Sequence, residues 1–233
     1  PSLSPDGKSI LFARGNSGKS EIFKISVKGD SIEQLTFMDA YSTTPVWSPD
    51  GREVAFGSRR GGHARIWKMS ASGRDIRAYI KTQLSDDLGA AGSYTLAWAP
   101  GSKIFYSRPG GRAMTVLDPA TEKGSDLMNG DSSGFVVTAI PSPAGDRIAV
   151  TWNRTKLQPP RQSIWIMGPG ANQQREIYQS ANADPERWSF DGSSLFALAV
   201  EPSETTVSGA HGSLVRISTS DGTIQSRREL PVE

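Results

Sequence analysis

Cysteine and long runs of apolar residues are both missing from this sequence of 233 residues. Without cysteine, the chain holds no disulfide, no cysteine nucleophile and no thiolate ligand for a metal ion. The longest apolar run covers residues 195–200, far short of the roughly 20 residues that a membrane-spanning helix needs. We therefore expect no disulfide scaffold and no direct insertion into a membrane.

A strong excess of charge of either sign is also missing. The 26 lysines and arginines nearly balance the 24 aspartates and glutamates, and the formal net charge is +2 at pH 7. This excess is too small to argue for nucleic acid, so we expect no nucleic acid partner. Glycine and proline are abundant, with 24 and 15 residues, which indicates a chain rich in turns.

A short turn motif recurs along the chain. Its first two copies are Ser4-Pro5-Asp6-Gly7 and Ser48-Pro49-Asp50-Gly51, and weaker copies follow at Ala99-Pro100-Gly101, Ser142-Pro143-Ala144-Gly145 and Ser189-Phe190-Asp191-Gly192. Proline pre-sets φ at the first corner, aspartate can bond its own backbone, and glycine accepts a positive φ. The third copy lacks aspartate and the fifth has Phe190 in place of proline, which weakens the turn prediction there.

Short apolar strands surround each copy of the turn. One follows it, as in Val54-Ala55-Phe56, and a further segment alternates polar and apolar residues, as in Arg65-Ile66-Trp67-Lys68-Met69. Four strands per unit, at a period in the forties, are typical of β-propeller blades. The sequence therefore predicts an all-β protein: one β-propeller region over 1–233, with about five four-stranded antiparallel blades at residues 1–39, 40–88, 89–132, 133–181 and 182–233.

The same residues resemble a known family. Pro45-Val46-Trp47-Ser48-Pro49-Asp50-Gly51, with the strands that follow it, is similar to the WD40-like repeats of TolB-type bacterial propellers. Residues 117–121, 146–154 and 163–167 resemble extracytoplasmic TolB-like propellers, which are found fused to some bacterial serine/threonine protein kinases. The resemblance implies a location in the bacterial periplasm or elsewhere outside the cytoplasm, with the cytoplasm as the alternative. By the habit of the family, it also implies that the chain is a fragment of a larger ring.

Residues suited to catalysis are scarce. Gly18-Lys19-Ser20 looks like the end of a phosphate-binding loop, but that loop needs a glycine where Ala13 stands and a helix where a strand is expected. We interpret it as a hairpin tip. No Gly-x-Ser-x-Gly elbow is present, and the two histidines, His63 and His211, lie in separate loops. We expect no catalytic residue, no metal site and no cofactor.

Five of the six tryptophans follow the repeat. Trp47, Trp98 and Trp188 directly precede the turn, and Trp67 and Trp165 occupy the third strand of their units. We interpret these five as core between neighbouring blades rather than as a ligand cage. Trp152 does not fit this pattern, which makes it the tryptophan to examine.

Charge separates two classes of loop that share one face of a propeller. The loops between second and third strands (14–21, 58–65, 107–113, 153–162 and 201–212) hold ten cations and three anions. The loops between blades hold Asp39, Asp86, Asp87, Asp131, Asp184 and Glu186 against Lys81. This face is either a solvated surface with weak local ion pairs or the docking surface for a protein partner. The candidate partner-binding residues are Arg59, Arg60, His63, Arg108, Arg112, Arg154, Lys156 and Arg161.

These observations favour a non-catalytic propeller that serves as a protein-interaction or sensing module of a larger bacterial protein. Two alternatives stay open. The propeller could regulate or gate an enzyme domain outside this stretch, either a protein kinase or a prolyl-oligopeptidase-like hydrolase. It could also bind a small ligand in its central channel, although the strands offer too few polar groups to name one.

Overall fold

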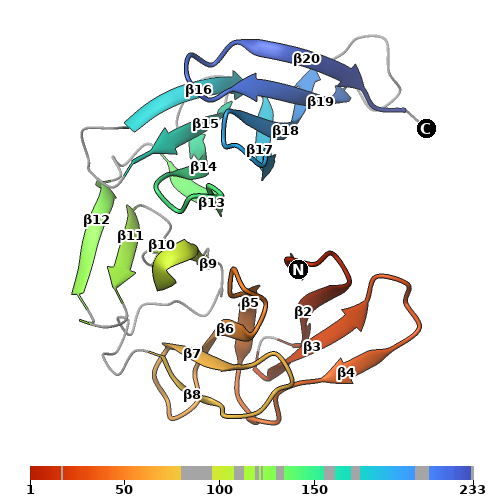
Figure 1. The fold of residues 1–233 in the computed structure, drawn as a ribbon, viewed down its shortest axis with the longest axis vertical. Coiled ribbons are helices and arrows are strands. Elements are labelled where there is room, and N and C mark those ends of the chain that lie inside the picture. The colour runs from red at the N-terminus through yellow and green to blue at the C-terminus, as the bar shows by residue number, and fades with distance from the viewer. Residues whose placement is uncertain are drawn as a thin grey trace. The chain divides into compact units, whose positions relative to one another are not determined.

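The computed structural model describes residues 1–16, 18–79, 96–107, 113–118, 121, 123–129, 134–154, 161–168, 174–202 and 210–231. Within these ranges the chain forms strands β1 to β20 and one short 3₁₀ helix, η1 (Pro100–Ser102). The strands make five four-stranded sheets, in which neighbours in sequence are neighbours in the sheet (Figure 1). The protein is therefore all-β, with five propeller blades, as predicted.

The blades follow one another along the chain. Blades 1 and 2 contain β1 (Ser2–Leu3), β2 (Ser9–Gly15), β3 (Ser20–Ser26), β4 (Ile32–Gln34), β5 (Ser42–Trp47), β6 (Glu53–Ser58), β7 (Arg65–Ser70) and β8 (Arg77–Ala78). Blade 3 contains β9 (Leu96–Trp98), β10 (Ile104–Ser107), β11 (Ala113–Asp118) and β12 (Lys123–Asn129). Blades 4 and 5 contain β13 (Phe135–Pro141), β14 (Ile148–Arg154), β15 (Arg161–Met167), β16 (Gln174–Ser180), β17 (Asn182–Trp188), β18 (Ser194–Pro202), β19 (Ala210–Ser218) and β20 (Ile224–Glu229).

Contacts within the chain divide it into two compact units. Unit 1 covers Pro1–Gly110 and Val116–Ser125, and thus holds blades 1 and 2 with β9 and β10. Unit 2 covers Gly111–Thr115 and Asp126–Glu233, and holds blades 4 and 5. The division passes through β11 and β12 of blade 3.

The turn between the first two strands has the predicted geometry in blades 1 and 2. In blade 2 the Ser48 hydroxyl donates to Asp50 Oδ1 (2.6 Å) and accepts from the amide of Glu53 (2.9 Å). Gly51 has a φ of 71°, and its amide donates to the Ser48 carbonyl (2.9 Å). Side-chain hydrogen bonds, together with a left-handed glycine, therefore close the turn.

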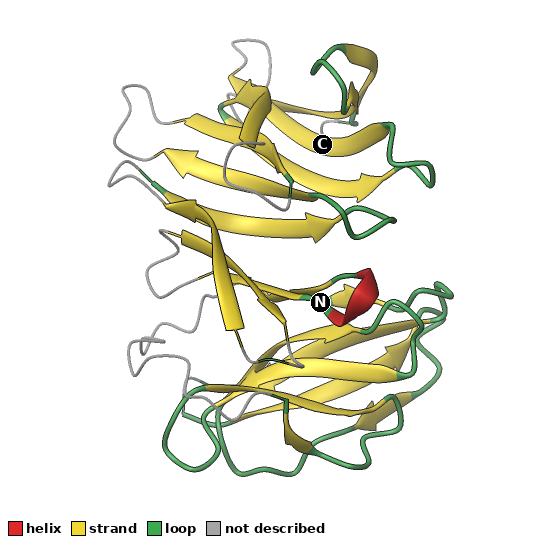
Figure 2. Cartoon of the chain, turned by 60° about the vertical axis from the view of Figure 1, so that its left-hand side comes forward, coloured by secondary structure: helices red, strands yellow, loops and turns green. Residues whose placement is uncertain are grey.

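The fifth copy of the turn has the same hydrogen bonds without proline. The Ser189 hydroxyl donates to Asp191 Oδ1 (2.6 Å), and the Gly192 amide donates to the Ser189 carbonyl (2.9 Å). Phe190, in the place of proline, is 99% exposed. The loss of proline does not change the turn, because serine, aspartate and glycine still make all its bonds. In the third copy the chain instead forms η1, the one helix of the described residues (Figure 2).

Tryptophans in front of the turn join neighbouring blades, as predicted. The Trp47 indole N–H donates to the carbonyl of Ser2 in the first strand of blade 1 (3.2 Å). Trp188 makes the equivalent bond from blade 5 to the carbonyl of Ile140 in blade 4 (2.9 Å). Trp98 is also buried, in a cluster with Ala55 and other apolar residues of unit 1. Trp47 and Trp188 therefore supply both apolar packing and a hydrogen bond between sheets, and Trp98 supplies packing.

The remaining tryptophans have different surroundings. Trp67 and Trp165 are half-buried, each with an arginine over its ring, and Trp67 packs at the edge of the core of blades 1 and 2. Trp152, the one outside the repeat pattern, is 2% exposed in β14. It therefore belongs to the core of blade 4.

None of the described residues forms a helix that is long and apolar enough to cross a membrane.

Candidate partner-binding face

In unit 1, two kinds of loop meet at one end of blades 1 and 2. The chain from blade 1 to blade 2 forms a parallel bridge between Tyr41 and Ser20, the first residue of β3. The carbonyl of Tyr41 also accepts from the amide of Arg59, which follows β6 (3.0 Å). The loops between second and third strands and the loop between blades therefore share a face here, as predicted.

A row of buried hydroxyls fixes these loops relative to one another. The Ser20 hydroxyl donates to the carbonyl of Ser42 (2.6 Å) and accepts from the Ser42 amide (3.1 Å). The Ser42 hydroxyl donates to that of Ser58 (3.0 Å), which in turn accepts from the amide of Arg60 (3.2 Å). All three serines are buried. The row runs from blade 1 to the first residues of the Arg59-Arg60 loop, so these hydrogen bonds hold the backbone where that loop begins.

The side chain of Glu21 in β3 holds the loop between blades 1 and 2 by hydrogen bonds. Its carboxylate accepts from the amides of Met38 (2.8 Å) and Asp39 (2.9 Å), and from the hydroxyl of Thr36. Asp39 has a φ of 51° and pairs with the ammonium of Lys19 at 2.5 Å. Both acidic side chains at this face are therefore already engaged within the protein.

Gly18-Lys19-Ser20 is the predicted hairpin tip and not a phosphate-binding loop. The amide of Asn16 donates to the carbonyl of Lys19 (3.0 Å), and Asn16 Oδ1 accepts from the amides of Gly18 and Lys19 (both 3.0 Å). β3 begins at Ser20, so no helix N-terminus faces the tip.

A groove of about 420 Å³ lies between these loops, and all of it belongs to unit 1. Its charged lining is one carboxylate, that of Asp39, and two guanidinium groups, those of Arg59 and Arg60. The guanidinium of Arg60 lies over the ring of Trp67, 5.6 Å from the centroid. The lining residues are Gly18, Met38, Asp39, Ala40, Tyr41, Arg59, Arg60, Gly61 and Gly62.

The other candidate residues lie elsewhere. Arg154, in unit 2, repeats the Arg60 arrangement, because its guanidinium lies 5.5 Å from the Trp165 centroid; it also pairs weakly with Glu176 (3.9 Å). Arg161 donates to Gln179 Oε1 (3.0 Å). His63 is exposed just beyond the groove lining. Arg108, Arg112 and Lys156 lie outside the described residues. Their role in partner binding stays a prediction.

The placement of Asp184 and Glu186 in a loop between blades is wrong. Both lie inside β17, the first strand of blade 5. The strand carries one extra residue, a β-bulge between Pro185 and Arg187. The bulge and the proline interrupt the alternation of side chains by which a strand is recognised in a sequence. Burial raises the pKa of Glu186, and the carboxylate of Asp184 raises it further. Asp86, Asp87, Asp131 and Lys81 lie outside the described residues.

Sequence reasoning missed the serine row and the arginine–tryptophan stacks. The two stacks share one spacing: each arginine lies four residues after the residue that pairs with the tryptophan in the neighbouring strand. These pairs are Phe56 with Trp67, for Arg60, and Val150 with Trp165, for Arg154. Among the described residues, no group of three or more histidines, aspartates and glutamates could hold a metal ion.

Comparison with known proteins identifies the repeat. A family model described as the TolB beta propeller domain matches residues 1–132. The chain belongs to the TolB β-propeller family. A comparison with curated protein sequences gives no match.

Solved structures show the same TolB-type fold. TolB from Acinetobacter baumannii aligns with a TM-score of 0.68 and 20% identity, over 100% of this chain and 54% of that one. A putative TolB from Agrobacterium tumefaciens aligns with a TM-score of 0.67 and 19% identity, over 100% and 90%. A prolyl endopeptidase aligns with a TM-score of 0.63 and 13% identity, over 100% of this chain and 35% of that one. This TolB-family propeller thus spans about half of the A. baumannii protein, and at these identities the likeness is one of fold.

Proposed function

We propose that this TolB-family propeller is a non-catalytic protein-interaction module of a larger bacterial protein. The observation that carries the proposal is the groove between blades 1 and 2. Buried hydrogen bonds tie both of its walls to the sheets, so a partner would meet a surface that is already ordered. A preorganised surface loses little entropy on binding, which favours recognition.

Charge at this face supports a protein partner with a complementary surface. The loop ends of blades 1 and 2 carry five cations, Arg14, Lys19, Arg59, Arg60 and Arg65, against the two anions Glu21 and Asp39. Glu21 is engaged by backbone amides, and Asp39 and Lys19 pair with each other, so the excess of positive charge at this face comes from the arginines. Electrostatic complementarity of this kind steers association and fixes the orientation of the partner.

The TolB likeness also supports a location in the periplasm or elsewhere outside the cytoplasm. Fractionation of cells that make the parent protein, with antibodies against the propeller, tests this part of the proposal. Recovery in the cytoplasmic fraction alone would contradict it.

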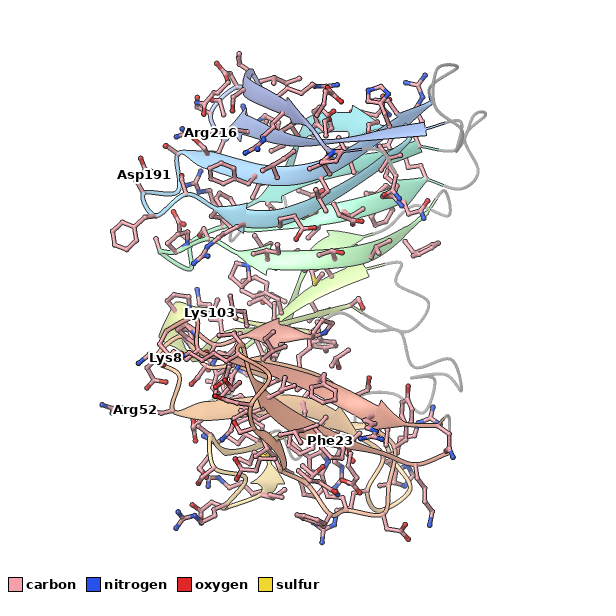
Figure 3. All side chains as sticks on the ribbon, turned by 90° about the vertical axis from the view of Figure 1, so that its right-hand side faces the viewer. Lys8, Phe23, Arg52, Lys103, Asp191 and Arg216 are labelled. Atoms are coloured by element: carbon pink, nitrogen blue, oxygen red, sulfur yellow. The ribbon has the colours of Figure 1, made fainter. Side chains whose placement is uncertain are left out.

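Reversal of two charges at the groove tests the interaction role. In the Arg59→Glu/Arg60→Glu variant, partners crosslinked to the wild-type protein in cells are expected to be lost. The matched control is Lys28→Glu/Arg74→Glu, which also reverses two exposed charges. These residues follow the C-terminal ends of β3 and β7, whereas the groove lies where these strands begin. Lys8 and Arg52 mark that opposite end in Figure 3. Equal recovery of the same partners with both variants would contradict the proposal.

A second candidate function is regulation of an enzyme domain in the same polypeptide. The likeness to a prolyl endopeptidase, of which the aligned part is 35%, supports it. The test is the peptidase or kinase activity of the full parent protein with and without residues 1–233. Unchanged activity and substrate range without the propeller would exclude this function.

A further inference from the structure

Arg60 supplies the charge of the groove with the most defined surroundings. Its amide donates to the buried Ser58 hydroxyl (3.2 Å), and its guanidinium lies over the half-buried ring of Trp67 (5.6 Å). Within the described residues, Arg60 has no ion-pair partner. The stack holds the guanidinium in place without using its N–H groups, which are the donors that a planar anion needs.

The acidic side chain that lines the opposite wall, Asp39, is exposed and pairs with Lys19 at 2.5 Å. Met38, Ala40 and Tyr41 also line this wall and carry no charge. A carboxylate ligand would therefore meet two arginines on one side of the groove and, on the other, a carboxylate that already has a cationic partner.

Two consecutive glycines keep the groove open beside Arg60. Gly61 and Gly62 have φ values of 82° and 88°, where a side chain is strained, and a Cβ at either position would meet no atom within 4 Å. The space that their side chains would fill is left to the groove. A volume of about 420 Å³ suits a few side chains of an extended peptide and not a large cofactor.

We propose that the groove binds an acidic segment of the partner protein, with a side-chain carboxylate of that segment paired to the guanidinium of Arg60. Arginine and carboxylate form two parallel charge-assisted hydrogen bonds, which gives the pair direction as well as strength. Trp67 acts as a positioning residue for Arg60. This inference rests on the proposed function, because it names the chemistry of the partner that the same face would recognise.

Peptides of defined charge test the inference directly on the full chain. The probe is a fluorescein-labelled, amidated hexapeptide of alternating glycine and glutamate, and its binding is measured by fluorescence anisotropy. The comparison peptides replace glutamate with glutamine, once amidated and once with a free C-terminal carboxylate. We expect the glutamate peptide to bind, the amidated glutamine peptide not to bind, and binding to weaken as salt is added.

Variants assign that binding to Arg60 and Trp67. Arg60→Glu is expected to weaken glutamate-peptide binding by at least about tenfold. The matched control Arg74→Glu is expected to leave it unchanged. Trp67→Leu is expected to weaken binding several-fold while Trp67→Phe, which keeps a ring under the guanidinium, restores it. Circular dichroism verifies that each variant is folded.

Three outcomes would overturn the inference. These are equal binding of the glutamate and amidated glutamine peptides, wild-type affinity in Arg60→Glu, and binding of only the peptide with a free C-terminus, which would assign the groove to a chain end. If partners are lost on reversal of Arg59 and Arg60 but no acidic peptide binds, the inference fails and the proposed function stands. If partners are not lost either, both fail.

Discussion

Serine and aspartate side chains hold the turns between the first and second strands. Ser4, Ser48 and Ser189 each donate to an aspartate two residues later, at 2.6 Å in all three turns. In blade 4 the aspartate lies four residues later, and the Ser142 hydroxyl reaches Asp146 at 2.7 Å. The sequence motif suggested proline as a defining residue, whereas the bonds depend on serine, the carboxylate and glycine.

Ser48→Ala is therefore expected to be more harmful than Pro49→Phe. Ser48 is buried, and its loss removes the hydrogen bond to the amide of Glu53 and one of the two bonds to the carboxylate of Asp50, at a cost of about 2 kcal/mol. Pro49→Phe reproduces the residue of blade 5 and costs less than about 1 kcal/mol, the entropy that proline removes from the unfolded chain. Urea unfolding measures both. A larger loss from Pro49→Phe would show that proline defines the turn.

Two turn carboxylates of blade 5, Asp191 between β17 and β18 and Asp221 between β19 and β20, make stability dependent on acid. Hydrogen bonds from Ser189 and from the Ser193 amide lower the pKa of Asp191 from 3.8 to about 2, and Ser218 and the Thr223 amide do the same for Asp221. Because the folded-state pKa lies below the unfolded value, the stabilisation is present above about pH 4. It is lost as pH falls towards 2.

The melting temperature, followed from about pH 5 to about pH 2, is expected to fall less steeply in Asp191→Asn/Asp221→Asn than in the wild-type protein. Asp30→Asn is the control, since Asp30 is an exposed turn residue without a hydrogen bond to its side chain from the described residues. An equal slope in all three proteins would contradict the role of the two turn carboxylates.

Strands of neighbouring blades are joined by hydrogen bonds as well as by apolar packing. The tryptophan before each of two turns donates to the first strand of the preceding blade, from Trp47 to Ser2 and from Trp188 to Ile140. By contrast, the buried indole N–H groups of Trp67 and Trp165 have no hydrogen-bond partner among the described residues. The same residue type therefore has two energetic roles at two positions of the repeat.

Trp47→Phe and Trp67→Phe isolate the hydrogen bond, since both make the same chemical change within unit 1. Trp47→Phe is expected to be less stable by about 1 kcal/mol, because only this variant loses a hydrogen bond. Urea unfolding followed by circular dichroism gives the difference. Equal stability would mean that Trp47 contributes through packing alone.

What could be predicted from the sequence is what repeats locally. The strands recur in every blade, and the serine–aspartate–glycine turn and the tryptophan before it recur in three blades each, so their pattern is visible without a fold. The bond between Ser42 and Ser58, the stack of Arg60 on Trp67 and the pairing of Lys19 with Asp39 were not predictable. They join residues with no shared pattern, across strands or blades whose register only the fold defines.

Arg154 and Arg161, expected in a loop, lie at the ends of β14 and β15, so the strands reach further than predicted. The wrong placement of Asp184 and Glu186 has another cause, the β-bulge in the first strand. Three blades carry an extra residue there, between Thr43 and Val46, between Val136 and Ala139, and between Pro185 and Arg187. A bulge shifts the alternation of side chains halfway along the strand. The alternation of the sequence therefore ends at the bulge, and it does not show that Asp184 and Glu186 belong to a strand.

At the scale of the whole molecule, the chain consists of two units with separate apolar cores. Leu11, Ile22, Trp47 and Phe56 belong to a core of unit 1. The core of blades 4 and 5 contains Ile164, Trp188, Leu195 and Ile217, all within unit 2. In repeat proteins each repeat is stabilised mainly by contacts with the neighbouring repeats, so a change in the core of one unit is expected to affect that unit and not the other.

Hydrogen exchange measures this independence. Ile22→Val removes a methyl group from a residue with no exposed surface and costs about 1 kcal/mol. Amides of β2, β3 and β6 are expected to exchange about fivefold faster, and those of β14, β15 and β18 at the wild-type rate. Ile217→Val, equally buried, is the reciprocal variant and should produce the opposite pattern. Uniform acceleration by both variants would show one cooperative unit.

The turn of blade 5 has a consequence for how distant propellers are compared. Phe190 stands where proline stands in Ser4-Pro5-Asp6-Gly7, and Asp146 supplies from a shifted position the carboxylate that Asp50 supplies in blade 2, yet the serine and the glycine keep their spacing. Alignments of relatives at about 20% identity should therefore be anchored on the serine–glycine pair, with proline left unweighted and the acidic residue allowed to move. Blades that a proline-based profile skips would then be counted.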